Sequence, residues 1–137
     1  MRAVFDTNIL VSAVFWRGGP YRCLLAAQAG IVELVLSEPI LSEFHRVLSG
    51  KFHLTPGQVE DNLAAMRATA TLVKIAGTLH VVSDDPDDDK FIETAQVARA
   101  EYLISGDRHL LNLGSYEGVT IRNARAFLDL MAQPSRS

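Results

Sequence analysis

The chain has 137 residues, of which 48% are hydrophobic and 21% are charged, and its net charge is −3. This composition is typical of a folded globular domain and excludes an intrinsically disordered chain. The single cysteine, Cys23, excludes an internal disulfide framework and a cysteine-based zinc site. No apolar run reaches the ~18 residues that span a membrane, and we expect no signal peptide at the N-terminus, so a cytoplasmic protein without a membrane partner is predicted.

Strand-like and helix-like patterns alternate along the chain. Apolar and β-branched runs predict strands at 2–5, 31–36, 73–75, 80–82, 102–105 and 119–121. Apolar residues at helical spacing predict helices that begin near residues 7, 20, 38, 56, 89, 108 and 124. This alternation predicts an α/β layered fold with a mainly parallel central sheet, formed as a single domain over residues 1–132 with a short frayed tail at 133–137.

The charge is unevenly distributed. Segment 84–93 holds six acidic residues and one lysine, which gives −5, whereas the other 127 residues hold 10 acids and 12 bases, which gives +2. A run of acids is most often a solvated loop, and a negative net charge by itself argues against a nucleic-acid partner. Because the acidic excess is confined to one segment and the rest of the chain is mildly basic, the net charge does not exclude a nucleic-acid partner, and it gives no positive evidence for one.

Four carboxylates are predicted to converge on one cleft. Asp6 directly follows the first strand and Asp107 lies two residues after the strand at 102–105, so both emerge at the carboxyl edge of the sheet. Asp89 falls in the first turn of the helix after the acidic loop, and Glu43 borders the apolar face of the helix after the second strand. Asp6 can cap the first helix and still offer an oxygen to a metal ion.

Clustered carboxylates repel one another unless a counter-charge is present. Oxygen-only acidic clusters are the usual ligands of Mg²⁺ or Mn²⁺, and such ions can position a phosphodiester and activate a water molecule. The sequence contains no G-x-S-x-G, P-loop, G-x-G-x-x-G or C-x-x-C motif that would indicate another chemistry.

Four short motifs in order resemble the PIN domain family, and more narrowly the VapC-like toxins of bacterial and archaeal toxin–antitoxin pairs. They are Val4–Leu10 (VFDTNIL), Ser37–Glu43 (SEPILSE), Asp85–Phe91 (DPDDDKF) and Tyr102–Asp107 (YLISGD). The resemblance covers about residues 1–130. It implies a three-layer α/β/α sandwich and an endoribonuclease that uses one or two Mg²⁺ or Mn²⁺ ions and a metal-activated water. It further implies a homodimer that is silenced by a small antitoxin.

The resemblance also implies the site residues. Asp6, Glu43, Asp89 and Asp107 match the acidic quartet of the family as metal ligands and catalytic groups. Asp89 is chosen because it directly precedes Lys90 and Phe91, and Asp87 and Asp88 are the alternatives to it. Secondary or substrate-binding roles are considered for a further set of residues, namely Asn8, Lys90, Glu93, Ser105 and Arg108.

The sequence is also compatible with other functions. The chain could be an RNA-processing nuclease that is not a toxin. A phosphatase of the haloacid-dehalogenase type also begins with an aspartate after the first strand, but it needs a second acid where this chain has Asn8. A non-enzymatic RNA-binding regulator is the third alternative. Trp16 with Arg17 could stack on a base, although packing is the simpler interpretation of this tryptophan.

Overall fold

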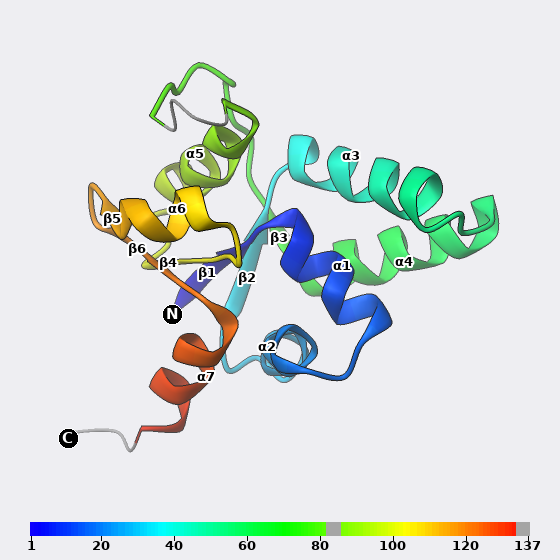
Figure 1. Cartoon of the computed structure of the whole chain (residues 1–137), viewed down its shortest axis with the longest axis horizontal. Helices are drawn as coiled ribbons and strands as arrows, with labels where there is room; N and C mark the ends of the chain where they lie inside the picture. Colours follow the sequence, from blue (N-terminus) through cyan, green and yellow to red (C-terminus); the bar gives the residue numbers. More distant parts are fainter. Residues whose placement is uncertain (82–85, 134–137) are drawn as a thin grey trace.

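The computed structural model describes residues 1–81 and 86–133, and helices and strands alternate along it (Figure 1). The strands are β1 (Arg2–Phe5), β2 (Glu33–Leu36), β3 (Thr71–Leu72), β4 (Tyr102–Ile104), β5 (Ser115–Tyr116) and β6 (Val119–Arg122). The helices are α1 (Thr7–Phe15), α2 (Gly19–Gln28), α3 (Glu38–Arg46), α4 (Pro56–Thr69), α5 (Asp89–Ala98), α6 (Arg108–Leu113) and α7 (Ala124–Ala132). A π-helical segment, η1 (Val47–Lys51), continues α3, and a 3₁₀ turn, η2 (Pro86–Asp88), precedes α5.

The strands form one sheet in the order β3-β2-β1-β4-β6-β5. All neighbouring strands are parallel except β5, which pairs antiparallel with β6. In the centre of the sheet, β1 and β4 are in register with Ala3 opposite Tyr102 and Phe5 opposite Ile104. The prediction of a mainly parallel sheet is therefore confirmed.

Two edge regions differ from the prediction. The third strand is Thr71–Leu72, followed by Val73, whose N–H donates to Leu36 O at 2.9 Å, and no strand forms over 74–81. Residue 82 of the predicted strand 80–82 lies outside the described residues. Strand β5 was not predicted, because its two residues gain their extended conformation from the hairpin turn before β6, where Glu117 and Gly118 have positive φ.

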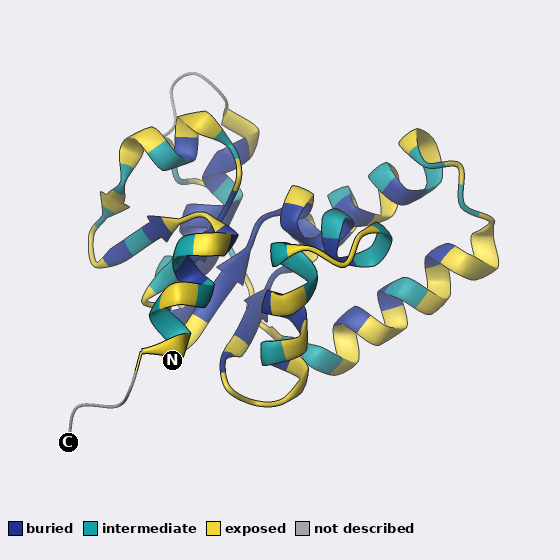
Figure 2. Cartoon of the chain, turned by 60° about the horizontal axis from the view of Figure 1, so that its bottom comes forward, coloured by how far each residue is buried: buried dark blue, intermediate teal, exposed yellow. Residues whose placement is uncertain are grey.

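Helices cover both faces of the sheet. Phe127 of α7 packs on one face, with its ring 6.5 Å from that of Phe5 and 5.5 Å from that of Tyr102, and α2 lies against α7. The other face is covered by α5, which buries Phe91 and Ile92 against β1, β2 and β4. The central strands β1, β2 and β4 are largely buried between these layers (Figure 2), whereas the edge strand β3 is exposed. The α/β/α sandwich is therefore confirmed.

In the described part of the chain, the helices are all too short or too polar to cross a membrane.

Candidate active site at the switch point of the sheet

The strand order reverses between β1 and β4, because the chain adds β2 and β3 on one side of β1 and places β4 and β6 on the other. In parallel α/β sheets, ligands bind beyond the carboxyl ends of the strands at such a switch point. The backbone continues the pairing there, since Asp6 N donates to Ile104 O at 3.0 Å and Ser105 N donates to Arg122 O at 3.0 Å. Asp6 and Ser105 therefore stand side by side at this edge.

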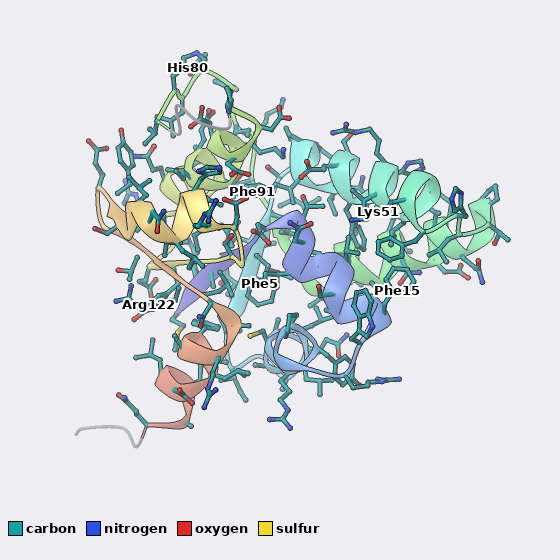
Figure 3. All side chains as sticks on the ribbon, viewed as in Figure 1. Phe5, Phe15, Lys51, His80, Phe91 and Arg122 are labelled. Carbon is teal, nitrogen blue, oxygen red and sulfur yellow. The ribbon has the colours of Figure 1, made fainter. Side chains whose placement is uncertain are left out.

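A cavity of about 160 Å³ lies at this position. Its lining is mostly acidic and polar, and consists of Asp6, Thr7, Asn8, Glu43, Val47, Asp87, Asp88, Phe91 and Asp107. Figure 3 shows Phe91 in the central part of the molecule, where α5 approaches the ends of the strands. The structure thus brings together three of the four carboxylates proposed from the sequence, Asp6, Glu43 and Asp107, with Asp87 and Asp88.

Asp6 is the most deeply buried of these acids, with a relative exposure of 2%. Its Oδ1 caps α1 by accepting a hydrogen bond from Ile9 N at 2.9 Å, and Ser105 Oγ donates to its Oδ2. Burial, together with the negative charges of Asp107 and Glu43, raises the pKa of Asp6 to about 6, although the hydrogen bonds from Ser105 and Ile9 oppose this shift. The carboxyl groups are therefore close enough to act on one another electrostatically.

Ser105 connects two of the acids. It is fully buried, and while its hydroxyl donates to Asp6 it accepts a hydrogen bond from Asp107 N at 2.9 Å. Asp107 caps α6 through its Oδ1, which accepts from His109 N at 2.7 Å. The buried hydroxyl orients the Asp6 carboxylate and sets the position of the backbone that carries Asp107.

Glu43 is held between two side chains. Thr7 Oγ1 donates to Glu43 Oε1, and Lys90 Nζ lies 3.4 Å from the same oxygen. Lys90 Nζ also donates to the carbonyl oxygen of Asp87 at 2.8 Å. The lysine therefore connects α3 to the acidic segment before α5. The sequence pointed to Lys90 but not to Thr7, whose only signal was its position directly after Asp6.

The three consecutive aspartates 87–89 have different environments. Asp88 is buried and lines the cavity, and Asp87 is exposed and also lines it. Asp89 is buried but is not among the lining residues, and its Oδ1 accepts a hydrogen bond from Val81 N at 2.9 Å. The structure therefore places Asp88, rather than Asp89, with Asp6, Glu43 and Asp107. Asp84 and Asp85 of the acidic segment lie outside the described residues.

Glu93 is buried and does not line the cavity. Its two carboxylate oxygens accept hydrogen bonds from Gly77 N at 2.8 Å and Leu79 N at 3.0 Å. Burial by itself would raise the pKa of Glu93, but bonding to the backbone N–H groups of Leu79, Gly77, Ala76 and Thr78 lowers it below its ordinary value. Glu93 is thus neither a cavity acid nor a surface residue, and it anchors the segment that leads to the acidic loop.

Glu93→Ala is expected to lower the free energy of unfolding by about 2 kcal/mol, because backbone donors would lose a charged acceptor. Urea unfolding followed by circular dichroism measures this change. Glu60→Ala, at an exposed position on α4, is the matched control and should change stability by less than about 0.5 kcal/mol. Equal effects of the two substitutions would contradict the anchoring role.

Asn8 and Arg108 are the remaining residues considered from the sequence. Asn8 is exposed and lines the cavity, so its amide is available to a substrate. Arg108 is exposed at the start of α6 and is not among the lining residues. The structure therefore supports a substrate-facing position for Asn8 more directly than for Arg108.

The donor set suits a hydrated divalent cation. The cavity offers carboxylate, hydroxyl and amide oxygens, which are ligands that Mg²⁺ and Mn²⁺ prefer. Within the described ranges, no three His, Cys, Asp or Glu side chains are placed to hold a metal ion by themselves. Mg²⁺ commonly keeps several water ligands and uses only one or two protein carboxylates directly, so a cavity with room for water is compatible with this mode of binding.

The parallel α/β sheet with an acidic cavity at its switch point is typical of an α/β enzyme, and comparison with known protein families identifies which family this is. The PIN domain family matches residues 2–109, and the chain therefore belongs to the PIN domain family. A chain of the crystal structure of VapBC2 from Rickettsia felis bound to a DNA fragment from their promoter is similar in fold, with a TM-score of 0.62 and 16% sequence identity, over 90% of this chain and 98% of that chain. In sequence, no curated protein matches the chain.

Proposed function

We propose that this chain is a metal-dependent endoribonuclease. The observation that carries the proposal is the convergence of Asp6, Glu43, Asp88 and Asp107 on one cavity at the switch point of a PIN-domain sheet. Proteins of the PIN domain family are nucleases, and the oxygen-rich cavity suits the Mg²⁺ or Mn²⁺ that cleavage of a phosphodiester requires.

The proposed metal ligands are Asp6, Glu43, Asp88 and Asp107, with Asp88 taking the place that the sequence motif had suggested for Asp89. When bound, a divalent cation would neutralise charge on the phosphate and lower the pKa of the attacking water. The chain itself contributes orientation. Ser105 holds the Asp6 carboxylate, Thr7 and Lys90 hold Glu43, and such supporting contacts fix the geometry of metal ligands.

The proposal extends to a biological role as the toxin of a type II toxin–antitoxin pair, with a small antitoxin protein as partner and a homodimer as the assembly. Its support is the resemblance of the four motifs to VapC-like toxins and the similarity in fold to VapBC2. The alternative is an RNA-processing nuclease of the same chemistry. The two differ in whether uncontrolled expression stops growth.

Cleavage is tested on the purified protein with single-stranded and structured RNA in Mn²⁺, with and without chelator. We expect cleavage in Mn²⁺ and none in chelator, and a decrease of at least about 100-fold for Asp6→Asn, since even supporting contacts of metal ligands contribute 10–100-fold. Asp129→Asn, an exposed position on α7, is the matched control and should cleave like the wild type. Equal cleavage by the Asp6→Asn protein would refute the assignment.

The toxin role is tested by induced expression of the wild type beside Asp6→Asn, with growth followed and RNA 5′ ends mapped. Growth arrest by the wild type alone, together with new 5′ ends, supports a toxin. New 5′ ends without growth arrest support the RNA-processing alternative.

A further inference from the structure

An aromatic patch lies at the far ends of two elements that begin at the cavity. It consists of Phe15, Trp16 and Phe52, together with the cations Arg17 and Lys51. The Phe15 and Phe52 rings are stacked with centroids 4.3 Å apart, and Trp16 lies edge-on to both, at 5.8 Å from Phe15 and 6.2 Å from Phe52. Trp16 nevertheless remains 57% exposed, the second most exposed of the large hydrophobic residues in the described part of the chain.

Two segments of unusual charge meet at this patch. Residues 7–32 and 44–59 together contain four bases, Arg17, Arg22, Arg46 and Lys51, and no acidic residue, although the whole chain has more acids than bases. Within the ranges that the structure describes, none of these four cations has an ion-pair partner. Lys51 Nζ lies 5.9 Å from the centre of the Phe52 ring and is exposed. The patch therefore combines exposed aromatic surface with uncompensated positive charge.

Two elements, α1 and η1, run from the proposed active site to the patch. Helix α1 begins at Thr7 and segment η1 begins at Val47, and both of these residues line the cavity. The far end of α1 is Phe15 and that of η1 is Lys51, both of which belong to the patch. A nine-residue helix is ~13 Å long, so a short stretch of polymer would connect cavity and patch. Figure 3 shows Phe15 and Lys51 on the same side of the molecule, at the ends of α1 and η1.

We propose that the aromatic patch binds the single-stranded part of an RNA substrate, with a base stacked on Trp16 and phosphates near Lys51 and Arg17. This inference rests on the proposed function and names the form of RNA that the site takes. Base-stacking aromatic side chains beside a positively charged path are the features by which proteins hold single strands. In a duplex the bases are already stacked on one another, so the patch favours unpaired nucleotides. An acidic protein segment would use the cations but would leave the exposed Trp16 ring without a stacking partner.

The test uses Trp16 as its own reporter, because it is the only tryptophan in the chain. A short oligouridine is titrated into the Asp6→Asn protein in the presence of chelator, so that binding is measured without cleavage. We expect quenching of the tryptophan fluorescence on binding, and weaker binding at higher salt. A duplex RNA of equal length should quench less.

Substitutions of Trp16 then test the contribution of stacking. Trp16→Ala in the Asp6→Asn background is expected to weaken oligouridine binding about tenfold, measured by fluorescence anisotropy of labelled RNA. Trp16→Phe, which keeps a ring, should lose less, and it also serves if the alanine variant fails to fold. Val97→Ala, at an exposed apolar position on α5, is the matched control and should bind like the parent.

The outcomes are distinct from those of the catalytic test. Unchanged fluorescence on RNA binding would overturn the proposal that the patch binds RNA. Equal RNA affinity of the parent and the folded Trp16 variants would also overturn it. Tighter binding of polyglutamate than of oligouridine with quenching would also overturn it, in favour of a site for an acidic protein segment. If the wild type fails to cleave RNA but quenching and the Trp16 effect are found, the nuclease proposal fails and the RNA-binding patch stands.

Discussion

Asp88→Asn is expected to lower Mn²⁺-dependent RNA cleavage by about 100-fold or more, whereas Asp89→Asn should leave cleavage within about tenfold of the wild type. The physical reason is that the two side chains lie in different surroundings. Asp88 lines the cavity with Asp6, while Asp89 accepts a hydrogen bond from Val81 N at 2.9 Å. An asparagine keeps an acceptor oxygen for Val81 but has no negative charge to offer a cation.

The two aspartates form a matched pair, because they are adjacent, of the same type and similarly buried, at 8% and 6% exposure. The measurements are kcat/KM on RNA and the affinity for Mn²⁺ by isothermal titration calorimetry. Asp88→Asn should weaken Mn²⁺ binding together with cleavage. A large loss for Asp89→Asn and a small one for Asp88→Asn would restore the assignment that the sequence motif suggests.

The second large effect concerns pH. In the metal-free protein, Asp6 is expected to reduce the free energy of unfolding progressively as the pH rises from about 4 to about 6. Its pKa in the folded state is about 6 against an ordinary value of 3.8, so the folded state binds the proton more tightly than the unfolded state. Below a pH of about 3.8, Asp6 is protonated in both states and does not reduce the free energy of unfolding. Above a pH of about 6, the reduction in the free energy of unfolding reaches its full size of up to about 3 kcal/mol.

Because other groups titrate in the same range, the measurement is the difference between wild type and Asp6→Asn. Urea unfolding in chelator at several pH values should show the Asp6→Asn protein gaining stability relative to the wild type as the pH rises, with most of the change between pH 4 and 6. A difference that is independent of pH would contradict a raised pKa for Asp6. Addition of Mn²⁺ should stabilise the wild type more at pH 7 than at pH 5, because protons compete with the cation for carboxylates.

Both predictions concern acidic residues that lie at the ends of strands or at the starts of helices in the sequence pattern. Alternating strand and helix patterns predicted a mainly parallel α/β sheet, and the positions of Asp6 and Asp107 directly after two strands predicted that they would meet. These features depend on local patterns of side chains and on the general geometry of parallel sheets, so the sequence alone was sufficient for them. In the structure, the pairing of β1 with β4 places both acids at the switch point.

The orientation of individual side chains depended on contacts between segments far apart in the chain. Successive residues at the start of a helix point about 100° apart, so the packing of η2 and α5 against the sheet determines that Asp88 lines the cavity and that Asp89 contacts Val81. Likewise, the support of Asp6 by Ser105 joins residues 99 positions apart. The aromatic patch joins Phe15 to Phe52. The sequence by itself determined which acidic side chains follow the strands, and long-range packing determined which of them line the cavity.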